Sequence, residues 1–135
     1  MSTLSVNTIK ALGNSVPVFQ NSSGVEKGQI IKSWITFVGE GTVSIRQSFN
    51  VSSITDNGTG DYTITYATAF SNTTYCLVGS ATEDEDGGAG NRGQFILSPT
   101  RAAHAAGSSR VHTMNCTNGN LFNCGRIEVH VIGDN

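Results

Sequence analysis

The stretch of residues 33–66 limits what this chain can fold into, because short runs of β-branched and aromatic residues alternate there with turn-forming residues. In residues 30–38, Ile35 and Phe37 would face one way and Trp34, the only tryptophan, the other. Residues 61–66 alternate in the same way. A period of two side chains is typical of half-buried β-strands, so we expect strands and not helices.

Between these runs lies the clearest turn signal, residues 56–60, whose Asn and Gly residues suit the positive φ of a hairpin loop. The expected strands are residues 30–38, 42–49, 61–66, 75–81, 93–98, 110–116 and 126–132. Seven or eight short strands with a turn about every ten residues indicate a β-sandwich or barrel. We expect an all-β fold with a single antiparallel β-sandwich head, residues 29–135.

Composition excludes several classes of function. The chain has 135 residues, is 37% hydrophobic and only 13% charged, and has a formal net charge of −2. Without a basic stripe, binding to a nucleic-acid backbone lacks its electrostatic driving force. No run approaches the roughly 18 apolar residues of a membrane span, so we expect no membrane insertion. The opening residues lack a secretory pattern, so we expect assembly in a cytoplasm.

Residues 1–28 differ from the rest, because sparse apolar residues stand there in polar sequence. These apolar residues are Leu4, Val6, Ile9, Val16, Val18 and Phe19. A disordered tail is one interpretation, and an extended arm that docks on a partner is the other. The regular spacing of the apolar residues, and the strand-like alternation of residues 16–19, favour an extended attachment arm.

Two groups of residues resemble metal ligands by type but not by spacing. His112, Cys116, Cys124 and His130 contain no compact pair, so a zinc site, scattered strand residues or a Cys116–Cys124 disulfide all remain open. The acidic residues 83–87 precede glycines but do not match an EF-hand loop. A calcium site, a solvated loop and a solvated loop that touches a ligand remain open there. We expect no metal and no cofactor.

Catalytic signatures are lacking. The sequence contains no G-x-S-x-G elbow, and four of its ten acids are bunched in one acidic loop instead of being placed as a pair. Glycine-rich residues 87–93 have no strand-to-helix context for cradling phosphate. We therefore predict that the protein is not an enzyme.

One stretch resembles a known family. The matching residues are Lys32, Trp34, Phe37, Gly39, Gly41, Thr42, Val43, Ile45, Arg46 and residues 48–63, with looser matches at residues 4–9 and 129–134. In this order they resemble the C-terminal domain of phage tail-fibre and receptor-binding proteins, notably those of phages that infect cyanobacteria and marine bacteria. The resemblance implies a homotrimeric virion protein of the tail, assembled in the host cytoplasm. It would attach to a baseplate or tail protein by its N-terminus.

The resemblance also implies that variable loops bind a host surface polysaccharide. The loops not covered by the match are residues 83–92, 99–110 and 117–124. Their charged and amide side chains are the receptor-binding candidates: Asp84, Asp86, Asn91, Arg92, Arg101, His104 and Arg110. Two alternatives stay open, a purely structural baseplate or adaptor protein of the virion and a lectin-like binding module unrelated to virions.

Overall fold

The computed structural model describes residues 6, 8–9, 19–28, 30–82, 93–97 and 104–133, and within these the chain forms strands and no helix. The strands are β1 (Phe19–Gln20), β2 (Glu26–Gly28), β3 (Ser33–Val38), β4 (Ser44–Phe49), β5 (Val51–Gly58), β6 (Asp61–Tyr66), β7 (Cys76–Thr82), β8 (Gly93–Leu97), β9 (His104–Ala105), β10 (Ser108–Asn115) and β11 (Arg126–Ile132). The prediction of an all-β chain is confirmed.

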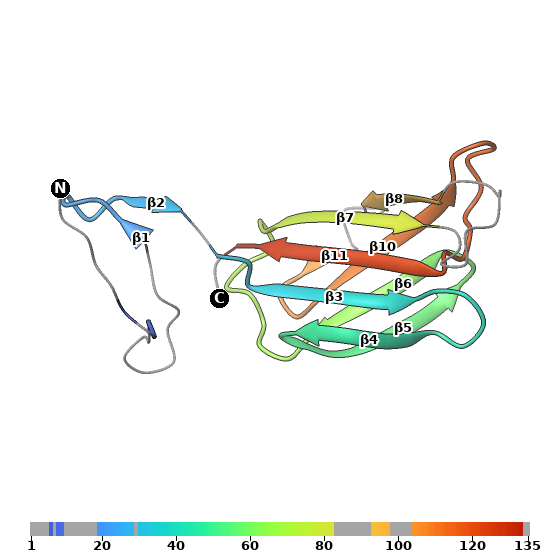
Figure 1. The fold of residues 1–135 in the computed structure, drawn as a ribbon, viewed down its shortest axis with the longest axis horizontal. Coiled ribbons are helices and arrows are strands. Elements are labelled where there is room, and N and C mark those ends of the chain that lie inside the picture. The colour runs from blue at the N-terminus through green and yellow to red at the C-terminus, as the bar shows by residue number, and fades with distance from the viewer. Residues whose placement is uncertain are drawn as a thin grey trace.

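Two antiparallel sheets form the body of the protein (Figure 1). The first sheet has the order β5-β6-β10-β8, with the short β9 also paired to β10. The second has the order β4-β3-β11-β7. The sheets lie face to face as the two layers of a sandwich, so the predicted β-sandwich is confirmed.

The core lies between the sheets and is made by alternate residues of their central strands. Its buried hydrophobic side chains are Ile35, Phe37, Tyr62, Ile64, Tyr66, Phe70, Leu77, Val111, Cys124, Ile127, Val129 and Val131. Phe37 of the second sheet meets Tyr62 of the first edge to face, with ring centroids 5.1 Å apart. Burial of this apolar area is the main stabilising term for such a domain.

Asn50 forms the corner at which the chain leaves β4 of one sheet and enters β5 of the other. It is the only described residue other than glycine with positive φ, at 54°. Its side chain donates to the carbonyls of Lys32 and Thr68, both at 3.1 Å, and accepts the Thr68 N–H at 2.7 Å. Asn tolerates this left-handed conformation better than most residues, and its amide replaces the ladder bonds that the corner interrupts.

Two of the predicted loops are partly strands. Strand β5 runs through Asp56 to Gly58, so the predicted loop of residues 56–60 shortens to a turn at Thr59–Gly60, with a register shift between Asp56 and Gly58. The predicted loop of residues 99–109 contains β9 and the start of β10. In both places, pairing with a neighbouring strand outweighs the local preference of Asn, Gly and Ser for turns.

The described part of the arm is a small hairpin, β1–β2, joined to the sandwich by residues 30–32 (Figure 1). The Asn21 side chain accepts backbone N–H groups of Ser23 and Val25 at 3.1 and 2.9 Å and so closes the hairpin turn. In Figure 1 the hairpin lies beyond the end of the sandwich at which the chain terminates. This end is called the arm-proximal end below, and the opposite end the distal end.

Candidate binding site

The outer face of the β5-β6-β10 sheet carries the largest group of interacting polar side chains in the described part of the chain. Strand register explains which side chains meet. Thr63 of β6 lies opposite Thr55 and Arg110, and Asp61 lies opposite His112. Directly opposed residues of antiparallel strands point to the same face. The alternation that buries Tyr62 therefore presents its polar neighbours to the outside.

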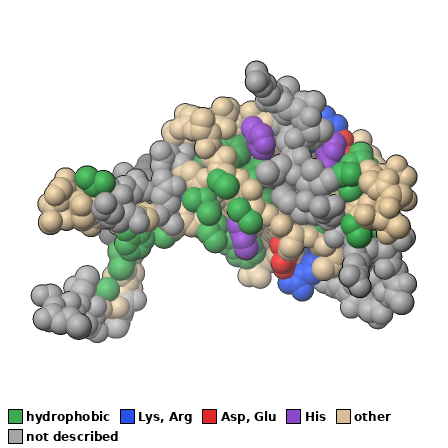
Figure 2. All heavy atoms as spheres, turned by 90° about the horizontal axis from the view of Figure 1, so that it is seen from above, with side chains coloured by type: hydrophobic (Ala, Val, Ile, Leu, Met, Phe, Trp, Pro, Cys, Tyr) green, Lys and Arg blue, Asp and Glu red, His purple; other side chains and the backbone are tan. Residues whose placement is uncertain are grey.

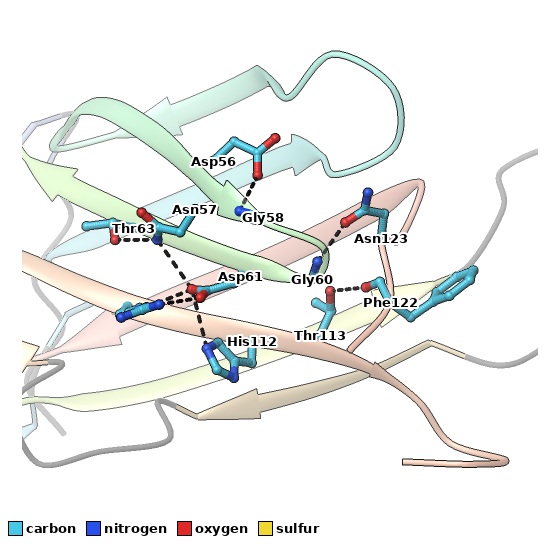
Figure 3. Close-up of polar contacts among 11 residues, drawn as sticks. Asp56, Asn57, Gly58, Gly60, Asp61, Thr63, His112, Thr113, Phe122 and Asn123 are labelled. Atoms are coloured by element: carbon cyan, nitrogen blue, oxygen red, sulfur yellow. Dashed lines mark hydrogen bonds and ion pairs between the residues drawn. The ribbon is translucent and has the colours of Figure 1, made fainter. Parts of the chain in front are cut away.

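Asp61 is at the centre of this group, which we call the Asp61 cluster: Asn57, Asp61, Thr63, Arg110 and His112 (Figure 3). Arg110 binds the Asp61 carboxylate through two nitrogen atoms. Its Nε donates to Oδ1 at 2.7 Å, and its Nη2 contacts Oδ2. Asn57 Nδ2 donates to Asp61 Oδ1 at 3.3 Å and to Thr63 Oγ1 at 2.9 Å. The bidentate pairing is the strongest geometry available to these groups.

His112 completes the cluster without a hydrogen bond of its own. Its Nε2 lies 3.3 Å from Asp61 Oδ1, close enough for an ion pair when the ring is protonated. The atom is buried, however, and its orientation gives no hydrogen bond to any described residue. The contact is thus electrostatic, and a protonated ring would add to the positive charge around Asp61.

The pKa of Asp61 is lowered, chiefly by the hydrogen bond from Arg110, while burial of the carboxyl works in the opposite direction. The same bond raises the pKa of Arg110. Asp61 is therefore ionised at neutral pH and holds the guanidinium in one orientation. The Arg110 side chain is still 46% exposed, so it stands on the surface as a pre-positioned hydrogen-bond donor.

A second set of bonds fixes the distal end of the sandwich next to this cluster (Figure 3). Gly60 N donates to Asn123 Oδ1 at 2.6 Å, and the buried hydroxyl of Tyr62 donates to the same oxygen at 3.0 Å. Thr113 Oγ1 donates to the Phe122 carbonyl at 2.6 Å. Burial raises the pKa of Tyr62 to about 12, so its hydroxyl remains a donor. These bonds tie the loop after β10 to the β5–β6 turn.

Gly60 is required at this turn for two reasons. Its φ is +64°, a conformation that L-residues with a Cβ rarely adopt. A Cβ at this position would also come within 2.5 Å of the Thr113 carbonyl oxygen. The absence of a side chain at Gly60 therefore lets three loop and strand segments approach each other.

The Asp61 cluster presents several polar groups that can bind a ligand. It offers a held guanidinium, an ionised carboxylate, an amide and a hydroxyl. Polar side chains of this kind recognise hydroxyl- and carboxylate-bearing ligands.

The structure brings only one of the predicted receptor-binding residues into this cluster. Asp84, Asp86, Asn91, Arg92 and Arg101 lie outside the described residues. Arg110 joins the cluster, but as a residue of β10 and not of a loop.

His104 lies on the other side of the same sheet. It pairs with buried Ser109, and its ring packs edge to face on Tyr75 at 5.5 Å. Burial lowers the pKa of His104, and its Nδ1 has no partner among the described residues. The prediction of a loop at residues 99–110 is wrong where the chain is described, because His104 and Arg110 lie in strands β9 and β10. Their binding to a receptor stays a prediction.

Sequence reasoning missed the partners of Arg110, although one signal was present. The alternation of residues 61–66 and 110–116 already placed Thr63 and His112 on the faces opposite Tyr62 and Val111. The alternation does not show that β6 pairs with β10. This pairing brings Asp61 next to Arg110, which is 49 positions away in the sequence.

The candidate metal ligands are separated. His112 lies on the first sheet and His130 on the second, and Cys116 is exposed whereas Cys124 is buried. Cys116 and Cys124 are not joined by a disulfide, so this one of the three open alternatives is excluded. Among the residues that the structure describes, no three His, Cys, Asp or Glu side chains are grouped as metal ligands. The acidic residues 83–87 lie outside that part.

Comparison of the chain with models of known protein families, with curated proteins and with solved structures finds no match. In the described part of the chain, no helix has the length and apolar character to cross a membrane. What the structure shows is a β-sandwich preceded by the β1–β2 hairpin, with the Asp61 cluster on one outer face.

Proposed function

We propose that this protein is a bacteriophage tail-fibre protein, located in the tail of the virion and assembled in the host cytoplasm. Its arm attaches to a tail or baseplate protein, and its head binds a polysaccharide of the host cell surface. It acts as a homotrimer. The resemblance of residues 32–63 to tail-fibre heads is the sequence basis of this proposal.

The exposed apolar side chains of the arm carry the proposal. Val6, Ile9 and Phe19 are exposed by 51%, 60% and 49%, and Val25 by 52%. Leu4, Val16 and Val18 lie outside the described residues. Apolar side chains gathered on one segment mark a surface that a partner covers. An attachment arm explains these exposed side chains, because docking on a partner would bury apolar groups that the head does not cover.

The head supports a binding role by its chemistry. Arg110 is held by Asp61 yet half exposed, and Asn, Ser and Thr side chains surround it on the same sheet. Such groups bind sugar hydroxyls one at a time and weakly. Several heads on one particle would raise the total affinity by acting together.

The proposal is tested by two measurements on the full chain. On a glycan array the labelled protein should bind at least one bacterial surface polysaccharide, and light scattering should give the mass of a trimer. Particles made with a fibre that lacks residues 1–28 should not incorporate it, although the shortened protein should still bind the array.

A monomer in solution would contradict the trimer, and incorporation without the arm would contradict the attachment role. If particles that lack only residues 83–92 adsorb normally and no glycan binds, the protein is a structural component of the virion and not a receptor-binding one. If a glycan binds but the protein never enters particles, it is a lectin-like module.

A further inference from the structure

The outer face of the second sheet carries a row of rings. Phe49 of β4 lies opposite Trp34 of β3, and Trp34 lies opposite His130 of β11. These three side chains, which we call the ring row, therefore stand side by side on neighbouring strands, about 4.8 Å apart from strand to strand. Val78 of β7 continues the row beyond His130.

The ring row is open to solvent. Phe49 is 55% exposed and Val78 52%, while His130 is exposed and Trp34 partly so. In Figure 1 this sheet faces the viewer, with β4, β3, β11 and β7 in sequence from bottom to top. Figure 2 looks onto the head from the side of β7 and β8 and shows hydrophobic side chains at its surface, with histidines among them.

A second row, polar throughout, runs beside the first. Gln47, Thr36, Glu128 and Ser80 lie opposite one another on the same four strands, two residues further along each. We call these four side chains the polar row. Glu128 Oε2 accepts from Ser80 Oγ at 3.2 Å, and Oε1 accepts from Arg126 Nε at 2.9 Å. The face thus combines flat apolar rings with hydrogen-bonding groups at a spacing of about 7 Å.

The charge on this face is balanced. Arg126 is the main cause of a lowered pKa of Glu128, so the carboxylate is ionised and its charge is offset by the neighbouring guanidinium. Arg126 is engaged by Glu128 and so does not offer an unpaired positive charge to a polyanion. Electrostatic complementarity therefore favours a ligand without net charge that can still donate hydrogen bonds to a carboxylate.

We propose that this face binds a neutral glycan chain. The apolar C–H faces of the sugar rings stack on Trp34 and Phe49, and sugar hydroxyls bond to Glu128 and Gln47. A second protein copy fits less well, because it would bury the ionised Glu128 beside the rings, and the cores of protein interfaces are depleted of charged residues. The inference rests on the proposed glycan receptor and assigns it a surface away from the loops.

The single tryptophan makes a direct test possible. Because Trp34 is the only tryptophan in the chain, its fluorescence reports on this face alone. The full-length protein is titrated at constant concentration with soluble fragments of dextran, mannan and galactan, and with chondroitin sulfate as a polyanion. We expect a saturable change in emission with at least one neutral glycan and none with chondroitin sulfate.

Three results would overturn the inference: no change with any neutral glycan, a change with chondroitin sulfate only, or, in a separate dilution series without sugar, a change in emission that follows protein concentration. The last would show that a second copy covers Trp34. If a glycan binds on the array while Trp34 emission stays constant, the proposed function stands and this inference falls. If Trp34 responds but particles without the protein adsorb normally, the inference stands and the proposed function falls.

Variants with exposed side chains extend the test without disturbing the core. Phe49→Ser should weaken glycan binding about tenfold, since it removes one of the two stacking rings. Glu128→Gln should weaken it less, because the amide still accepts one hydrogen bond. The matched control is Ile31→Ser, which removes a 43% exposed apolar side chain from the segment that joins the hairpin to the sandwich and should bind as the wild type. Equal binding by Phe49→Ser and the wild type, with the fold checked by circular dichroism, would refute the site.

Discussion

The two outer faces of the sandwich have the same backbone construction and opposite surface chemistry. On the first sheet, Asp61 and Arg110 satisfy each other, and the carboxylate is buried among its partners. On the second sheet, Phe49 remains more than half exposed. Polar side chains can satisfy one another's hydrogen bonds within a single chain. Exposed aromatic rings remain in contact with water, so their burial by a ligand would still be favourable. The polar groups of the first face are therefore expected to contribute to stability as well as to binding, whereas the exposed rings of the second face are expected to contribute to binding alone.

The largest effect should come from the core that both faces share. Phe37→Ala removes a fully buried ring that packs on Tyr62 and should lower the free energy of unfolding by about 3–5 kcal/mol, measured by urea denaturation. Phe49→Ala, the same change on the outer side of the same sheet, should alter it by no more than about 0.5 kcal/mol. Equal losses would mean that Phe49 is part of the core and would remove the contrast between the faces.

Gly60→Ala should cause the next largest effect. Positive φ costs a residue with a Cβ about 1–2 kcal/mol, and the contact with the Thr113 carbonyl adds to this cost. Gly119→Ala is the control, since φ is +73° there but the nearest atom to an added Cβ lies 3.8 Å away. Thermal unfolding should show a greater loss for Gly60→Ala. If the two variants have the same melting temperature, close packing at the distal end is not the reason why glycine is needed at position 60.

The two carboxylates that pair with arginine give the most direct comparison of the faces. Asp61→Asn should destabilise the protein by about 1–2 kcal/mol at pH 7, because the buried carboxylate loses its charged hydrogen bonds to Arg110. Glu128→Gln should cost less than about 1 kcal/mol, since its side chain is 35% exposed. Urea titrations of both variants measure this difference, and a greater loss for Glu128→Gln would reverse the roles assigned to the faces.

The pH dependence of this difference has a definite sign. The folded-state pKa of Asp61 is lowered below its ordinary value of 3.8. Its contribution is therefore complete above that value and is lost as the pH falls through the folded pKa. The gap in stability between wild type and Asp61→Asn should close on acidification. A gap that stays constant down to pH 2 would show that the ion pair is not its source.

His104 should give the smallest effect and belongs to neither outer face. The pKa of His104 is lowered in the folded protein, whereas in the unfolded chain it is about 6.5. As the pH falls below about 6.5, His104 is therefore protonated more readily in the unfolded chain, and the wild type loses stability. His104→Phe keeps a ring against Tyr75, removes the unpartnered nitrogen and should be more stable at pH 5 by up to about 1 kcal/mol. Melting at pH 5 and pH 8 measures this, and the same melting difference at both values would exclude titration as the cause.

Much of the fold follows from the alternation of residues along each strand. In β11 the pattern places Val129 inward and Glu128 and His130 outward, and the structure has them so. In β10 it likewise separates Val111 from His112. This was predictable because the period of two is a local property of extended backbone and needs no knowledge of the neighbouring strand.

The sites were not predictable, because each is assembled from strands far apart in the sequence. Arg110 meets Asp61 only because β10 pairs with β6, and Trp34 stands beside His130 only because β11 pairs with β3. At Asp56 the structure has a strand in place of the predicted loop because β5 pairs with β6. Local pattern thus decides which way a side chain points. The long-range closure of the sandwich decides what it meets, since pairing and register are chosen by how all strands together bury one core.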